Sequence, residues 1–177
     1  MATLVNFIIF QIGWFACVLG GANHWPWLGT AVAGALIAVH LWRVAQPRPE
    51  LTLLLIAGAM GLVFDSLLVT LGLVQFPSGT LIEGMAPHWI IAMWMMFATT
   101  LNITFRWLKG RLVLAAVLGA VAGPLAYYAG AELGGVSFSQ LQTSLLALAL
   151  VWGIAMPLLM VLSDRFDGTA ETVRENA

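Results

Sequence analysis

Apolar positions in this chain are grouped in long blocks, with no strand-like alternation and polar or turn-forming residues between them. Six such apolar runs can be marked out: Leu4–Ala22, Trp27–Ala45, Leu51–Val74, Pro87–Phe105, Leu112–Ala131 and Thr143–Leu162. Each run is close to the ~20 residues that a helix needs to cross ~30 Å of hydrocarbon. A helix also satisfies its own backbone hydrogen bonds in lipid. The pattern therefore predicts an all-α polytopic membrane protein, a compact bundle of six transmembrane helices.

The connections between these runs are short and rich in proline and glycine, as at Pro47-Arg48-Pro49 and Gly134-Gly135. Connections this short allow one compact bundle only. We therefore predict a single six-helix domain over residues 1–163. From residue 164 to residue 177 the chain becomes polar, and we expect a flexible cytoplasmic tail there.

Composition agrees with lipid as the solvent. Of the 177 residues, 61% are hydrophobic and 8% are charged, whereas soluble domains are about half apolar and about a quarter charged. A chain of this length could not bury so much apolar surface in water. The net charge of −1 supplies no basic face for a nucleic-acid partner.

The basic residues predict the orientation of the bundle. All seven fall in the second connection, in or beside the fourth connection, or in the tail: Arg43, Arg48, Arg106, Lys109, Arg111, Arg165 and Arg174. With six spans, these segments lie on one side of the membrane together with both termini. Since cytoplasmic loops carry the excess of Lys and Arg, both termini are predicted to be cytoplasmic.

Asp65 is the first candidate for chemistry because it is the acid that lies deep inside an apolar run. A charged residue at that depth costs about 2.5–3.5 kcal/mol on the insertion scale. Gly58 and Gly61 share its helical face, so a neighbouring helix can approach closely and Asp65 should point into the bundle. Two interpretations remain open: an acid, base or ligand-binding group, or a hydrogen bond between helices.

A second set of candidates lies on the fourth run, where His88, Thr99, Asn102 and Arg106 recur at helical spacing. An arginine at the membrane interface could bind an anionic headgroup, but a stripe of this kind more often ties helices together. We add to the candidate binding residues Gln11, Trp14 and Trp94, although tryptophans at mid-membrane depth are more often packing residues.

Catalytic and cofactor motifs are not found. The three histidines (His24, His40 and His88) show no metal-ligand spacing, and no phosphate loop, dinucleotide fingerprint or nucleophile elbow occurs. We therefore expect no metal and no cofactor. Whether the chain is an enzyme stays open. Because no set of catalytic side chains can be identified, a binding role is favoured.

Several short motifs together resemble a known family. They are Asn6-Phe7, Phe10-Gln11, Trp14-Phe15, Gly20-Gly21-Ala22, Asp65-Ser66, Trp94 with Thr99-Thr100-Leu101-Asn102, and Trp107-Leu108. The pattern resembles domain-of-unknown-function family 2878, uncharacterised bacterial inner-membrane proteins to which no reaction is assigned. Genes for similar proteins lie near enzymes that modify membrane fatty acids. The resemblance thus implies a bacterial inner-membrane location and a lipid-related role.

Three functions follow as hypotheses. The leading one is an accessory protein that binds or handles a lipid or another apolar molecule, with polar contacts from Asp65, Asn102 and Arg106. The second is a membrane-embedded enzyme that uses Asp65 as acid or base. The third is a small-molecule transporter part similar to the binding subunits of vitamin-uptake transporters, where Ala16-x-x-x-Gly20 would dock a membrane protein partner. Membrane lipids are expected partners in all three.

Overall fold

The computed structural model describes residues 2–169 and confirms an all-helical chain. Its helices are α1 (Ala2–Ala22), α2 (Pro26–Arg43), α3 (Pro47–Thr70), α4 (His88–Ala98), α5 (Leu112–Glu132) and α6 (Leu141–Arg165), with a 3₁₀ turn η1 at Arg106–Leu108. Two short strands were not predicted. They are β1 (Val74–Gln75) and β2 (Ser137–Phe138), which pair antiparallel and join the end of α3 to the start of α6.

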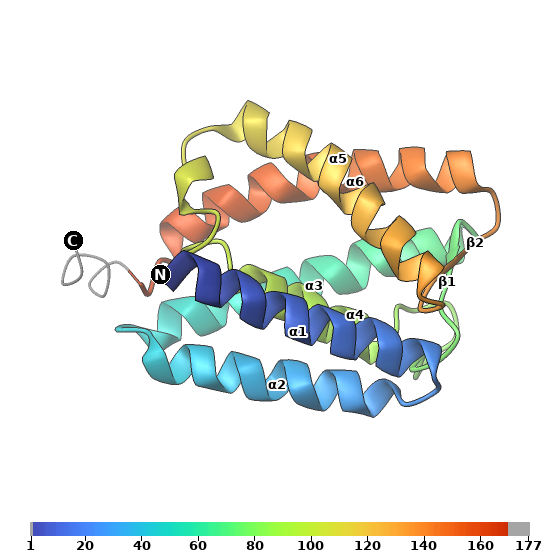
Figure 1. Cartoon of the computed structure of the whole chain (residues 1–177). Helices are drawn as coiled ribbons and strands as arrows, with labels where there is room; N and C mark the ends of the chain where they lie inside the picture. Colours follow the sequence, from blue (N-terminus) through green and yellow to red (C-terminus); the bar gives the residue numbers. More distant parts are fainter. Residues whose placement is uncertain (1, 170–177) are drawn as a thin grey trace.

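The helices pack as three pairs, and the short helix α4 lies at the centre of the bundle. α1 packs on α2, α3 on α4, and α5 on α6, and α4 also contacts α1 and α2 (Figure 1). α5 and α6 form a hairpin on the side of the molecule away from α2. Residues of α4 such as Trp89, Ile90 and Met96 are buried in the main hydrophobic core. The shortest helix therefore fills the centre of the bundle.

Close contact between α1 and α2 depends on small residues. A Cβ on Gly20 would lie 3.0 Å from the carbonyl oxygen of Trp25, and a Cβ on Gly29 would lie 2.5 Å from the Cα of Cys17. The Cys17 side chain is 0% exposed, and its thiol donates to the carbonyl oxygen of Gly29 at 3.5 Å. The small-residue spacing from Ala16 to Gly20 is thus used inside the chain, against α2.

The fourth apolar run does not form the predicted helix over Pro87–Phe105. α4 ends at Ala98, and the chain continues through tight turns to η1. The hydroxyls of Thr99 and Thr100 donate to the carbonyl oxygens of Met96 and Phe97, at 2.7 and 2.6 Å. Such local bonds compete with continued helix. Because residues 99–102 are buried in protein, irregular backbone is tolerated there.

The third run is displaced from its predicted span of Leu51–Val74. Pro47 and Pro49 fall in the first turn of α3, where the missing N–H groups cost nothing, so the helix begins before Glu50. At the other end Gly72 adopts φ +68°, and the N–H of Leu73 donates to the carbonyl oxygen of Leu68 at 3.0 Å. This closing turn is typical of a glycine that ends a helix.

Four of the described helices are long and apolar enough to cross a membrane: α1, α3, α5 and α6. α4 has 11 residues, or about 16 Å at ~1.5 Å per residue, so it cannot cross alone. α2 has 18 residues and carries His40 and Arg43 in its last turn. The structure therefore supports a membrane protein with four candidate spans.

Candidate functional site

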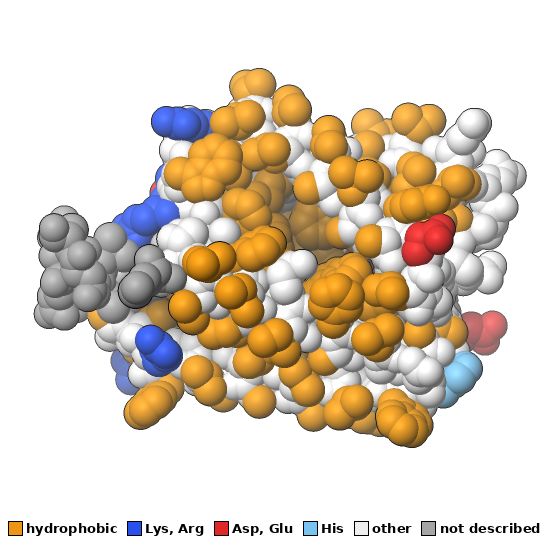
Figure 2. All heavy atoms as spheres, in the orientation of Figure 1, with side chains coloured by type: hydrophobic (Ala, Val, Ile, Leu, Met, Phe, Trp, Pro, Cys, Tyr) orange, Lys and Arg blue, Asp and Glu red, His pale blue; other side chains and the backbone are white. Residues whose placement is uncertain are grey.

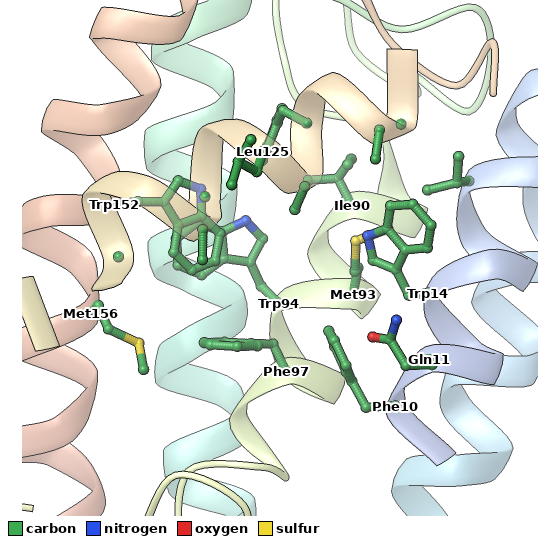
Figure 3. Close-up of a pocket in the computed structure, with 18 of the residues that line it drawn as sticks. Phe10, Gln11, Trp14, Ile90, Met93, Trp94, Phe97, Leu125, Trp152 and Met156 are labelled. Atoms are coloured by element: carbon green, nitrogen blue, oxygen red, sulfur yellow. The ribbon is translucent and has the colours of Figure 1, made fainter. Parts of the chain in front are cut away.

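A cavity of about 680 Å³ lies between α1 and α5, with walls from α1, α4, α5 and α6. Figure 2 shows it as a hollow bordered by hydrophobic side chains, and Figure 3 shows the side chains around it. Among the described residues, its lining includes no Asp, Glu, Lys, Arg or His. The volume is within the range of ~300–1,000 Å³ usual for ligand pockets. The arrangement suits an uncharged, apolar occupant.

Aromatic rings form the wall of this cavity on the side of α4 and α6. The rings of Trp94 and Trp152 stack at 4.5 Å with 17° between their planes, and Phe97 meets Trp152 edge-on at 5.4 Å. Glycines make room for these rings: a Cβ on Gly61 would overlap Trp94, and one on Gly123 would overlap Trp152. The wall therefore depends on close packing with two neighbouring helices.

Asp65 lies directly behind that wall and is 1% exposed. Its Oδ2 accepts a hydrogen bond from the indole N–H of Trp94 at 2.7 Å, and its Oδ1 accepts one from the hydroxyl of Tyr127. Both donors line the cavity, whereas Asp65 does not. Within residues 2–169 it forms no ion pair with a basic side chain. Asp65 thus joins α3 to α4 and α5 and holds two side chains of the cavity wall.

A separate polar cluster, formed by His40, Glu50, Asn102 and Gly168, lies at the other end of α3. Glu50 is 0% exposed. Its carboxylate accepts hydrogen bonds from the Asn102 amide at 2.7 Å and from the Gly168 backbone at 3.1 Å, and it lies 3.0 Å from His40 Nε2. This cluster was not predicted from the sequence, because Glu50 lies just before the third apolar run.

The segment after α6 folds against this cluster. Asp167 pairs with Lys109 Nζ at 2.9 Å and with Arg106 at 3.1 Å, and the backbone and hydroxyl of Thr169 donate to it. Burial raises the pKa of Asp167, but hydrogen bonds from Lys109 and Thr169 and the charge of Lys109 bring that pKa below its ordinary value. The tail was expected to start at residue 164. Residues 164–169 instead contact the bundle, and residues 170–177 lie outside the described part.

The structure divides the predicted site residues between two places. Gln11, Trp14 and Trp94 line the cavity. Asn102 and Arg106 lie at the Glu50 end instead, and the Thr99 hydroxyl bonds to its own turn. The prediction that Thr99, Asn102 and Arg106 share one helical face is therefore wrong, because α4 ends at Ala98, before all three. Tyr127 and Trp152 were missed as site residues, although a tyrosine among the small residues of α5 was a usable signal.

No group of three His, Cys, Asp or Glu side chains in the described chain could hold a metal ion. The chain matches no curated protein and no solved structure. The model of a family described as "protein of unknown function (DUF2878)" matches residues 3–158. The chain belongs to this family. In this DUF2878 protein the matched residues include all the residues that line the cavity. They also include Asp65, His40, Glu50 and Asn102, but not the segment after α6.

Proposed function

We propose that this protein is a multi-pass protein of the bacterial inner membrane that binds a lipid or another apolar molecule in the cavity between α1 and α5, as an accessory to membrane lipid modification. The uncharged lining of that cavity carries the proposal. Exposed apolar side chains flank it on both sides, among them Phe15 on α1 and Leu125 on α5. An occupant can therefore enter sideways from the bilayer without passing through water.

We further propose six membrane crossings with both termini in the cytoplasm, α2 and α4 crossing with the help of their neighbours. The arrangement of the helix ends supports this. The start of α1, the α2–α3 connection, the η1 segment and the end of α6 gather at one end of the molecule (Figure 1). The six basic residues of the described chain lie in or beside these segments: Arg43, Arg48, Arg106, Lys109, Arg111 and Arg165.

The two other hypotheses gain no supporting observation. An acid or base must reach its substrate, but Asp65 is covered by Trp94 and Tyr127, which occupy both of its oxygens. The Ala16-x-x-x-Gly20 spacing, which would dock a transporter partner, packs against α2. Asp65 is better explained as a support of the cavity wall.

The proposal can be tested by filling the cavity with a larger side chain on α5. Ala126 lines the cavity and is exposed, so Ala126→Phe adds a ring to the open space without displacing a packed neighbour. Val121→Phe on the same helix is the control, because Val121 is 55% exposed and is not part of the lining. Lipids extracted from the purified variants would be compared by mass spectrometry with those of the detergent-solubilised membrane.

The expected result is one or a few lipid species enriched in the wild type and in Val121→Phe, and a loss of that enrichment in Ala126→Phe. An unaltered, membrane-like lipid profile in all three proteins contradicts the proposal.

A further inference from the structure

Gln11 is a polar side chain in an otherwise apolar setting. It lies at the middle of the 21-residue helix α1, about 15 Å from either end of the helix at ~1.5 Å per residue. Its side chain lines the cavity, and Figure 3 shows its amide group on the cavity side of α1, beside Trp14. If α1 crosses the bilayer, this amide lies at mid-membrane depth.

The amide of Gln11 has no hydrogen-bond partner among residues 2–169. Transfer of an amide from water to an apolar medium is unfavourable unless the amide finds a hydrogen-bond partner there. Across the cavity, the indole Nε1 of Trp152 is buried and also lacks an acceptor in the described chain. Two walls of the cavity thus contain polar groups that form no hydrogen bond within the described part of the chain.

The occupant can complete the bonding of Gln11. We propose that the cavity selects a lipid chain that carries an uncharged oxygen function, a hydroxyl or a ketone, near its middle, and that the Gln11 amide binds this oxygen. This inference rests on the proposed apolar ligand and specifies its class. The absence of charged side chains from the described lining excludes an ionic anchor. Ester groups of ordinary phospholipids lie at the membrane interface, so a plain hydrocarbon chain offers Gln11 nothing at mid-depth.

The amide can bind either function, because its N–H groups donate to a ketone or hydroxyl oxygen and its carbonyl accepts from a hydroxyl. A net hydrogen bond of ~0.5–1.5 kcal/mol corresponds to a preference of about twofold to tenfold for the oxygenated chain. Binding sites that hydrogen-bond a ligand discriminate against the analogue that lacks the polar group, because their own polar atoms stay unpaired.

The experiment compares two matched probes, methyl 12-hydroxystearate and methyl stearate, which differ by one hydroxyl group. Each is titrated into the detergent-purified full-length protein, and bound ester is counted by native mass spectrometry. Gln11→Leu removes the amide at similar volume. Asn6→Leu is the polar-to-apolar control on the same helix, since Asn6 bonds to Thr99 and Thr104 and is not part of the lining.

We expect wild type and Asn6→Leu to prefer the hydroxy ester about twofold to tenfold, and Gln11→Leu to bind the two esters with equal affinity. Equal affinities in the wild type, or a preference that survives Gln11→Leu, overturn the role of Gln11 and leave the apolar cavity function intact. If neither ester binds the wild type and Ala126→Phe also leaves the lipid profile unchanged, both proposals fail.

Discussion

At the scale of single residues, Asp65 derives its importance from the two side chains that it holds. Replacement by Asn keeps one oxygen acceptor but places an NH₂ group against the other donor. A buried donor left without an acceptor costs about 1–3 kcal/mol, and each kcal/mol lowers the melting temperature by about 2–4 °C in a chain of this size.

We therefore predict that Asp65→Asn lowers the thermal unfolding midpoint of the detergent-solubilised protein by several degrees. Tyr127→Phe removes one of the two hydrogen bonds to Asp65, and the bond from Trp94 remains. We therefore expect a smaller loss of stability, about 1 kcal/mol. Glu83→Gln is the control, since Glu83 is exposed. An unchanged midpoint in Asp65→Asn would show that the carboxylate does not support the wall.

The Asp167 carboxylate should make the stability of the protein depend on pH. Its pKa is lower in the folded protein than in the unfolded chain, where it is near 3.9. Its contribution to stability is therefore complete above about pH 3.9 and is lost as the pH falls through the lowered pKa. We expect the melting temperature of wild type to exceed that of Asp167→Asn at pH 6, and the two to converge in acid. Asp164→Asn, at an exposed carboxylate, should follow the wild type throughout.

At the scale of elements, the segment after α6 acts as a strap over Glu50. A Cβ on Gly168 would overlap the carbonyl oxygen of Gln46 and lie 2.6 Å from Glu50 Cγ. We predict that Gly168→Ala detaches the strap, so that trypsin cleaves after Arg165 several times faster. Gly34→Ala, where an added Cβ meets nothing within 4 Å, should leave the cleavage rate unchanged. Equal rates in the two variants would mean that the strap is held elsewhere.

Much of the element layout could be predicted from the sequence, since apolar runs near 20 residues in length have one stable form in lipid. The end of α4 could not, because Thr99 and Thr100 are compatible with a helix until their hydroxyls bond to the preceding turn. The start of α3 was missed for a similar reason: Pro47-Arg48-Pro49 was interpreted as a break, although prolines are accepted in a first turn. Because of these two errors, Glu50 was overlooked, and Asn102 and Arg106 were grouped with Asp65 although they lie at the Glu50 end of α3.

The candidate site was predictable only in part. Gln11, Trp14 and Trp94 could be named because polar or amphipathic side chains at mid-depth are uncommon. The cavity itself depends on tertiary contacts that no local pattern specifies, such as the close packing of Gly123 on α5 against Trp152 on α6.

At the scale of the whole molecule, the proposed orientation places the α2–α3 connection inside the cell and the connection after β1 outside. Arg48, in the first turn of α3 beside that connection, and Thr80, in the connection after β1, are both exposed. In intact cells, an impermeant maleimide should label Thr80→Cys but not Arg48→Cys, and permeabilised cells should be labelled at both. The reverse pattern would invert the bundle and move the basic end to the outer face.

The buried thiol of Cys17 can report the unfolding of this protein without any added label. It is the one cysteine in the sequence and is fully enclosed between α1 and α2. A fluorogenic thiol dye should stay dark while the helices remain packed and brighten as they separate on heating. Melting curves for variants without an added cysteine can then be recorded in detergent with no engineered label.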